Sequence, residues 1–140
     1  MTLTIRPFEE RDRPAVVDLW QRCGLVRPWN DPDRDIDRKL TVQPELFVVG
    51  ELAGVLVGSV MAGFDGHRGW MNYLCVDPDH TGRGYGRALV THVEAALRAL
   101  GCPKVNLQVR SSNAAVLAFY AGLGYGLDEV VSMGKRLVAD

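Results

Sequence analysis

Alternating glycines separate two stretches of regular structure near the middle of the chain. Residues Trp70–Val76 are rich in apolar and aromatic side chains, and the Asp77–Pro78 pair ends a strand, because proline disfavours helical backbone in its predecessor. An amphipathic pattern with helical spacing begins near Arg87. The glycines lie between these segments, in Gly82-Arg83-Gly84-Tyr85-Gly86. The sequence therefore predicts a strand, a tight turn and a helix in direct succession.

A turn of this composition before a helix predicts an anion-binding site. Without Cβ atoms the backbone can approach an anion closely, and the positive end of the helix dipole faces the same point. A phosphate or pyrophosphate suits this arrangement, although a turn that merely joins strand to helix is the alternative. A dinucleotide fingerprint is excluded because Arg87 stands where its third glycine is needed, and no Gly-Lys-Ser/Thr of a P-loop follows.

The composition is that of an ordinary globular domain. The 140 residues are 47% apolar and 24% charged, which predicts a single domain over residues 1–140. The net charge of -1, with basic residues spread along the chain, argues against a nucleic-acid partner. The three cysteines lack metal-ligand spacing, so we expect no metal and reduced thiols in the cytoplasm. We also expect no leader and no membrane anchor, since no apolar run approaches the roughly 18 residues of a span.

The remaining pattern alternates strands with helices and predicts an α/β fold. Further strands are expected at Thr2–Pro7, Leu46–Leu52, Val55–Phe64 and Lys104–Val109, with a closing strand or hairpin at Tyr125–Leu137. Helices are expected from Asp12 to Gly24, from Asp33 to Leu40, from Arg87 to Leu100 and from Asn113, as N-cap, through Leu123.

Two blocks of sequence resemble the GNAT superfamily of N-acetyltransferases. The first joins Leu74-Cys75-Val76-Asp77-Pro78 to Gly84-Tyr85-Gly86, with Thr81 where the superfamily has Arg or Gln. The second comprises Leu107-Gln108-Val109-Arg110, Ser112-Asn113-Ala114-Ala115, Phe119-Tyr120 and Leu123-Gly124-Tyr125. Three further segments look like those of YpeA-type GNAT proteins: Arg27–Pro32, Asp65–Gly69 and Gly101–Lys104. The resemblance thus covers nearly the whole chain.

The resemblance implies a fold and a co-substrate. The fold is a mixed, mostly antiparallel sheet with a central parallel splay, flanked by about four helices. The co-substrate is acetyl-CoA, with its pantetheine arm on the backbone of Leu74, Cys75 and Val76. Its pyrophosphate would be bound by Thr81, Gly82, Arg83, Gly84, Tyr85, Gly86 and Arg87, and Asn113 is also assigned to cofactor binding.

The resemblance further implies direct attack of an amine on the thioester, with the oxyanion stabilised by a backbone N–H at the end of the Leu74–Val76 strand. Tyr120 occupies the position of the phenol that protonates the departing thiolate. Its helical spacing with Val116, Phe119 and Leu123 alternatively predicts a core residue. For Cys75, a small buried side chain is favoured over a nucleophile, since no histidine partner is in sight.

The general base is not evident. Gln108 replaces a Glu that ribosomal-protein acetyltransferases of the superfamily use, so we expect an acceptor amine of low pKa. A water chain to Asp65, His67, Asp77 or Tyr73 is another route, and each of these is otherwise a surface or turn residue. The segment Arg27–Leu40, with Trp29 and four aspartates, is predicted either to hold a cationic acceptor or to form a solvated helix in which Asp35 pairs with Arg38 or Lys39.

The predicted function is transfer of an acetyl group from acetyl-CoA to a primary amine of a small molecule or of a peptide or protein, within a ternary complex. One alternative is a non-catalytic acyl-CoA-binding sensor of the same fold. Another is a phosphate-ligand module unrelated to CoA. The oligomeric state is left open. A homodimer is one possibility, because dimers are common for chains of this size and fold.

Overall fold

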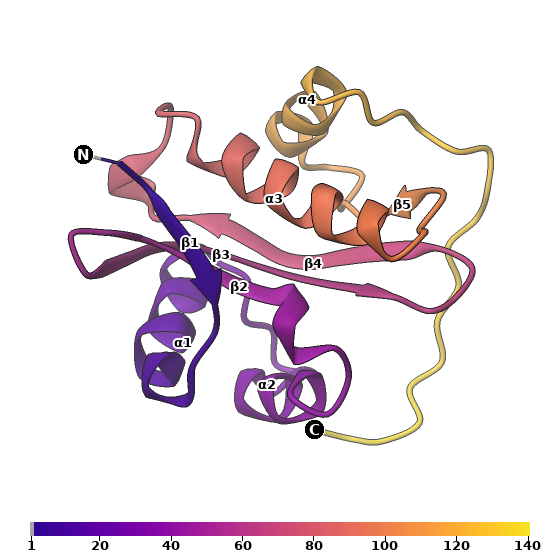
Figure 1. The fold of residues 1–140 in the computed structure, drawn as a ribbon. Coiled ribbons are helices and arrows are strands. Elements are labelled where there is room, and N and C mark those ends of the chain that lie inside the picture. Colours follow the sequence, from indigo (N-terminus) through magenta and orange to yellow (C-terminus); the bar gives the residue numbers. More distant parts are fainter. Residues whose placement is uncertain (1) are drawn as a thin grey trace. The chain divides into compact units, whose positions relative to one another are not determined.

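A computed structural model of the protein describes residues 2–140. The chain divides into two compact units, Met1–Leu107 and Gln108–Asp140. Within the described residues, the first unit contains a five-stranded sheet and the helices α1, α2 and α3, and the second contains α4 (Figure 1). None of the helices formed by residues 2–140 is both long and apolar enough to cross a membrane.

The sheet of the first unit has the order β1-β2-β3-β4-β5. Its strands are β1 (Thr4–Pro7), β2 (Phe47–Leu52), β3 (Val55–Phe64), β4 (Gly69–Val76) and β5 (Val105–Asn106). Neighbours from β1 to β4 are antiparallel, whereas β4 and β5 run parallel. The predicted α/β fold with a mixed, mostly antiparallel sheet is confirmed. The predicted hairpin at Ala53–Gly54 is also confirmed, and both of its residues have positive φ.

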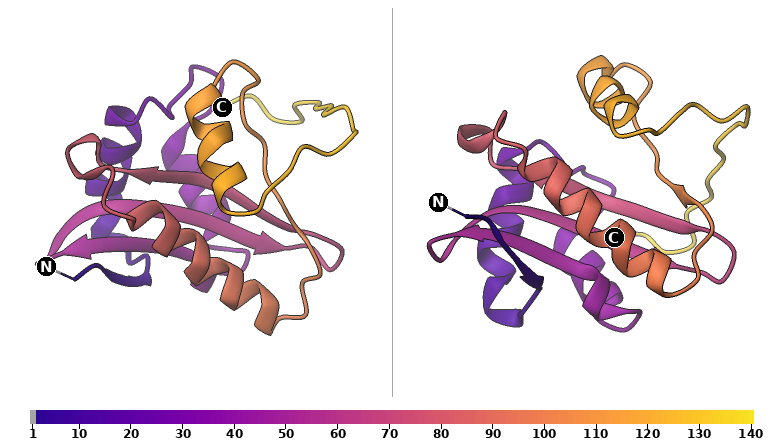
Figure 2. Two further views of the ribbon diagram at one scale, coloured as in Figure 1. Left: turned by 90° about the horizontal axis from the view of Figure 1, so that it is seen from above. Right: turned by 45° about the horizontal axis from the view of Figure 1, so that its top comes forward.

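Helices cover both faces of this sheet. Figures 1 and 2 show α1 (Arg13–Arg22) and α2 (Pro32–Lys39) against one face and α3 (Tyr85–Ala99) against the other. Short 3-10 turns, η1 (Glu10–Asp12), η2 (Pro44–Leu46) and η3 (Pro78–His80), join the larger elements. The helix α3 begins two residues before the expected start because Gly84, in a left-handed conformation, takes the N-cap position.

The core on the α1 and α2 face is built around Trp20. Its ring is fully buried and stacks on Tyr73 of β4, with centroids 3.8 Å apart. Its indole N–H donates to Ser59 Oγ at 2.9 Å, so the one polar atom of the ring is satisfied. On the opposite face, a Cβ at Gly58 would lie 2.8 Å from a methyl carbon of Leu89. The glycine therefore lets α3 approach the sheet closely.

A bulge interrupts β4 in its middle. Ser59 of β3 pairs with Cys75, but Met61 pairs with Asn72, so β4 has one residue more than β3 in this interval. Tyr73 adopts a left-handed φ of 54° there. Bulges bend the strand that carries the extra residue and increase its twist. The bulge thus redirects the end of β4 that leads into the glycine turn.

The parallel partner strand is shorter than expected. We predicted a strand over Lys104–Val109, whereas β5 comprises Val105–Asn106 and pairs only with Gly69 and Trp70. The bulge further along β4 accounts for this difference, because a bent strand cannot keep a straight parallel neighbour in register. Beyond Trp70, β4 therefore continues to Val76 without β5 beside it.

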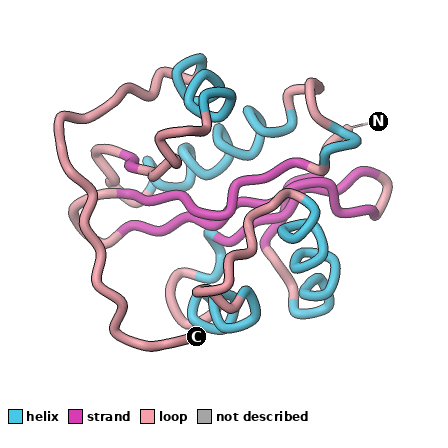
Figure 3. Tube along the Cα trace, turned by 180° about the vertical axis from the view of Figure 1, so that it is seen from behind, coloured by secondary structure: helices cyan, strands magenta, loops and turns pink. Residues whose placement is uncertain are grey.

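The second unit contains α4 (Ala114–Gly122), capped by the Asn113 side chain, which accepts from the N–H of Val116 at 3.2 Å. The predicted closing strand or hairpin at Tyr125–Leu137 was wrong, since these residues form no strand and Figure 3 draws the C-terminal segment as loop. Two glycines, Gly126 and Gly134, weaken strand formation, and no other strand lies in this unit to pair with the segment.

We expect the Arg6–Asp12 ion pair to contribute to the stability of the first unit. Arg6 donates to both Asp12 oxygens at 2.8 and 2.9 Å, and this hydrogen bonding lowers the pKa of the Asp12 carboxyl. The stabilisation is therefore complete above the ordinary pKa of 3.8 and is lost as the pH falls through the lowered value. Asp12→Asn should reduce the free energy of unfolding in urea at pH 7 by about 2–3 kcal/mol.

The matched control is Asp18→Asn, which breaks the exposed pair with Arg22 on the surface of α1. We expect a change below about 0.5 kcal/mol for this variant. Equal losses in the two variants, or a difference that does not shrink as the pH falls below 3.8, would contradict the assignment.

Candidate functional site

The turn after β4 is fixed by Asp77. Its N–H donates to the carbonyl of Val57 at 2.7 Å, and its carboxylate accepts from the Asp79 N–H at 2.9 Å and from Arg22 Nη1 at 2.8 Å. These hydrogen bonds lower the pKa of the Asp77 carboxyl, so it is ionised at neutral pH. Asp77 therefore anchors the start of the turn to β3 and α1.

The glycines of the turn leave open space at the start of α3. Gly82 and Gly84 have φ values of 77° and 82°, and a Cβ at either position would have no neighbouring atom within 4 Å. Gly84 is the N-cap of α3 and supplies no side-chain cap, so the first N–H groups of the helix lack side-chain acceptors at this end. This arrangement matches the predicted anion site.

Positive charge lies beside these N–H groups. The side chains of Arg83 and Arg87 are both exposed, and Arg83 Nη1 lies 3.2 Å from His80 Nδ1. Thr81 instead turns its hydroxyl to the carbonyl of Pro78 at 3.3 Å. The predicted residues from Thr81 to Arg87 thus follow one another into the N-terminus of α3, and two exposed arginines are among them.

Strand β4 leads directly into this surface. Its predicted site residues, Leu74, Cys75 and Val76, follow the bulge and lie beyond the last residue that pairs with β5. The Cys75 side chain is buried on the α1 face, where its Sγ lies 3.4 Å from Ser59 Oγ. Hydrogen bonding with the Cys23 thiol and burial raise the pKa of the Cys75 thiol. The structure therefore favours Cys75 as a packed thiol rather than a nucleophile.

The second unit contains the remaining predicted residues. Tyr120 is the buried residue of α4, and burial raises the pKa of its phenol to about 12. Its ring makes edge contacts with Phe119 and Tyr125, at centroid distances of 5.1 and 5.5 Å. Gln108 donates to the hydroxyl of Ser132. The burial agrees with the expected core position of Tyr120 and with a phenol that keeps its proton at neutral pH.

The acidic segment around α2 is largely committed to structure. Asp31 caps α2 by accepting from the N–H of Asp33 at 2.9 Å, and Asp37 pairs with Arg13 at 2.7 Å. Asp35 pairs with Arg38 at 3.1 Å, as the solvated-helix interpretation predicted, and also accepts from the Tyr73 hydroxyl at 2.5 Å. The structure thus favours a solvated helix, whose acids pair with Arg38 of the same helix and with Arg13 of α1, over an acidic acceptor site.

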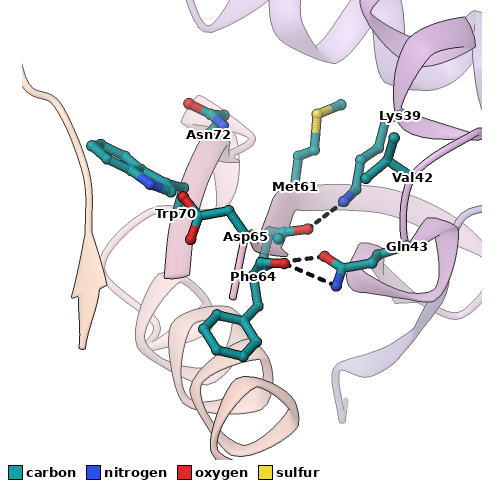
Figure 4. A pocket seen from close by; sticks show the side chains of 10 residues that line it. Lys39, Val42, Gln43, Met61, Phe64, Asp65, Trp70 and Asn72 are labelled. Atoms are coloured by element: carbon teal, nitrogen blue, oxygen red, sulfur yellow. Dashed lines mark hydrogen bonds between the residues drawn. The ribbon is translucent and has the colours of Figure 1, made fainter. Parts of the chain in front are cut away.

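A cavity of about 220 Å³ lies beside α2, at the hairpin end of β3 and β4 (Figure 4). Lys39 from the end of α2 and Trp70 and Asn72 from β4 line it, together with Met61 of β3. Sequence reasoning did not identify this cavity. The only available signal was the position of Lys39, three residues after the core residue Ile36 on the same helix, which places both on the side facing the sheet.

Comparison with known proteins assigns the family. Residues 13–125 match the model described as the Acetyltransferase (GNAT) family. An acetyltransferase of Sodalis glossinidius is 52% identical over 139 residues, which cover 99% of this chain and 98% of that protein. The chain therefore belongs to the GNAT family of acetyltransferases, as the resemblance predicted.

Solved structures show the same fold. The ribosomal-protein-S18-alanine N-acetyltransferase from Escherichia coli is 27% identical, with a TM-score of 0.72, over 88% of this chain and 77% of that one. The paia N-acetyltransferase from Thermoplasma acidophilum, solved in complex with coenzyme A, is 16% identical with a TM-score of 0.73, and the match covers 94% of each chain. The fold of the present chain is that of GNAT acetyltransferases.

The glycine turn can be tested by Gly84→Ala. An alanine at φ 82° costs about 1–2 kcal/mol, and relaxing that strain would move the first N–H groups of α3. We expect the Kd for CoA, measured by calorimetry, to rise about tenfold.

Gly24→Ala is the matched control, because Gly24 has φ 71° and equally open surroundings but lies after α1. It should lose similar stability while its Kd for CoA stays unchanged. A Kd that responds equally to both substitutions would show that the turn has no special role.

Proposed function

We propose that the protein transfers an acetyl group from acetyl-CoA to a primary amine by direct attack within a ternary complex. One observation carries this proposal. The edge of β4 that β5 leaves unpaired runs directly into the open glycine turn at the start of α3. The edge offers unpaired backbone groups and the turn offers N–H groups and arginines, so one elongated ligand with an amide-bearing arm and a pyrophosphate fits both. We further propose that the two units act as one domain, because the family match spans both of them.

Different residues would bind different parts of acetyl-CoA. Backbone groups of Leu74, Cys75 and Val76 would pair with the pantetheine amides, as an added strand pairs with a sheet edge. The segment Thr81–Arg87 would bind the pyrophosphate through N–H groups, the helix dipole and two guanidinium groups. Asn113 is included in the cofactor site, where its carbonyl oxygen is already used to cap α4.

The chemistry requires no covalent enzyme intermediate. The amine nitrogen forms the new N–C bond, the C–S bond breaks with its electron pair going to sulfur, and the sulfur takes up one proton as the nitrogen loses one. A backbone N–H at the end of the Leu74–Val76 segment, on the edge of β4 that β5 leaves unpaired, would stabilise the oxyanion.

Tyr120 is proposed as the proton donor to the departing thiolate. Its raised pKa of about 12 means that the phenol is protonated at any pH near neutrality. Its hydroxyl could therefore donate this proton to a sulfur anion placed beside it.

We expect Tyr120→Phe to lower kcat by about 10- to 100-fold, the usual contribution of a positioned acid, with little change in the Kd for acetyl-CoA. Thiol release gives kcat and calorimetry gives Kd. Tyr125→Phe is the control, because it changes the ring partner of Tyr120 and should leave kcat within about twofold. An unaltered kcat in Tyr120→Phe would remove this residue from the mechanism.

The acceptor is proposed to be an amine of low pKa. Asp77 is tied to Arg22, and Asp65 accepts from the N–H groups of His67 and Arg68 at 2.8 and 2.7 Å, so neither carboxylate is held for proton transfer. An amine with a pKa of about 10.4 costs about 4.6 kcal/mol to deprotonate at pH 7, whereas an α-amine near 7.8 costs about 1 kcal/mol.

Two isomeric peptides test this expectation. One has a free α-amine, and the other has a blocked α-amine and a free Lys side chain. We expect kcat/KM at pH 7 to be at least about tenfold higher for the α-amine, and the gap to narrow as the pH rises toward 10. Equal rates at pH 7 would mean that a base operates, and the hydrogen-bonded Tyr73–Asp35 pair would be the first candidate.

The same panel separates the enzyme from a sensor. One observation favours a non-catalytic protein. Gln108 stands where ribosomal-protein acetyltransferases of the superfamily use a Glu, and its amide donates to the Ser132 hydroxyl. Binding of acetyl-CoA without thiol release on any amine would support the sensor and contradict the enzyme.

A further inference from the structure

The cavity beside α2 contains a buried cation. Lys39 is only 9% exposed, and its ammonium group reaches into the cavity from the last turn of α2 (Figure 4). It donates to the carbonyl of Ala62 at 2.5 Å. An ammonium has three donors, and within residues 2–140 no other hydrogen bond or ion pair of Lys39 is found. Two of its N–H groups are thus left without a protein acceptor.

An anion in the cavity would offset the cost of burying this ammonium. Burial lowers the pKa of Lys39, because removing an ammonium from water disfavours its charged form, and the charge of the Glu45 carboxylate acts in the opposite direction. The one carboxylate that lines the cavity, Asp65, is exposed at the rim and accepts from the N–H groups of the β3–β4 turn. A buried cation beside an accessible cavity is the arrangement expected of a binding site for an anionic group.

The cavity lies beside the proposed reaction centre. Asn72, which lines it, directly precedes the Tyr73 bulge in β4. On α2, Lys39 is one helical turn after Asp35, which accepts from the Tyr73 hydroxyl. Leu74 lies two residues after Asn72, so the cavity and the proposed acyl position are about 7 Å apart along β4.

The walls of the cavity itself suit a short apolar linker. Met61 and Trp70 supply apolar surface on the same face of the sheet, and Asn72 adds one amide. A volume of about 220 Å³ is below the roughly 300 Å³ of a drug-sized ligand pocket, so it suits the end of a small molecule.

We propose that the acceptor of this acetyltransferase is a small amine that also carries an anionic group, and that this group binds Lys39 in the cavity beside α2. The inference rests on the proposed function, since the amine must reach the acyl group beside the β4 bulge. A carboxylate and a phosphate share the required chemistry. The amine nitrogen forms the amide bond as the C–S bond breaks, and the anionic group is unchanged by the reaction.

Four acceptors with the same α-amine test the proposal, because they differ only at the far end. Glycylglycine carries a carboxylate, glycyl-2-aminoethyl phosphate a phosphate, glycylglycinamide no charge at that end and glycyl-2-(trimethylammonio)ethylamine a cation that cannot be acetylated. We expect kcat/KM for at least one anionic acceptor to exceed that for the neutral one by about tenfold or more, as for a charge-assisted hydrogen bond. Whichever of the two anionic acceptors has the higher kcat/KM shows whether the site prefers a carboxylate or a phosphate.

The variant Lys39→Met should remove this preference by lowering kcat/KM for the anionic acceptor about tenfold or more, while the neutral acceptor changes by less than about threefold. Lys39→Arg keeps the charge and should keep the preference. Arg98→Met is the matched control, because it removes a positive charge from an exposed position on α3, on the opposite face of the sheet. It should leave the preference intact.

The outcomes separate the two proposals. If amines are acetylated without preference for an anionic group, or with preference for the cation, the inference is overturned and the proposed function stands. If no amine is acetylated although acetyl-CoA binds, the proposed function fails, and thermal shifts with CoA present decide the inference. A rise in Tm with the anionic compounds that is absent with glycylglycinamide supports it, and no rise overturns it. Should Lys39→Met fail to fold, the acceptor preference of the unmodified protein is still decisive.

Discussion

The stacking of Trp20 on Tyr73 supports the feature on which the rest of the site depends. Tyr73 has a left-handed φ of 54°, which costs a non-glycine residue about 1–2 kcal/mol. Three contacts hold it there. The indole ring of Trp20 stacks on its ring with centroids 3.8 Å apart, and the Ser59 hydroxyl donates to its carbonyl at 3.0 Å. The Tyr73 hydroxyl in turn donates to the Asp35 carboxylate at 2.5 Å. These contacts come from α1, β3 and α2, so the strained residue is fixed from three sides.

The bulge at Tyr73 has consequences on both sides of the sheet. It ends the pairing of β4 with β5, which leaves the backbone of Leu74–Val76 available to a ligand. Beyond it, Asp77 ties the strand end to α1 and β3, so the glycine turn begins from a fixed point. On the α2 face, the same stretch of β4 borders the cavity that contains Lys39. A co-substrate site and a candidate acceptor site thus lie at successive positions of one strand.

Local patterns predicted much of this architecture. The Ala53–Gly54 break predicted the β2–β3 hairpin, and the alternating glycines predicted a tight turn before α3, because both depend on residues adjacent in sequence. In the structure Gly82 and Gly84 of this turn have positive φ. The bulge could not be predicted, since no residue near Tyr73 signals a left-handed backbone and its support comes from Trp20 and Ser59. The short β5 follows from that bulge, so its prediction failed for the same reason. The buried ammonium of Lys39 was equally hidden, because it depends on packing against Ala62 of a distant strand.

The central claim is that the edge of β4 and the glycine turn form one binding surface for the co-substrate. Amide hydrogen exchange with and without CoA tests this claim most directly, because pairing with a ligand slows the exchange of each N–H that it binds. We predict slower exchange in Leu74–Val76 and in Gly82–Arg87 when CoA is present, with no change in β1 and β2. Protection confined to other segments, or no change at these amides at saturating CoA, would contradict the account.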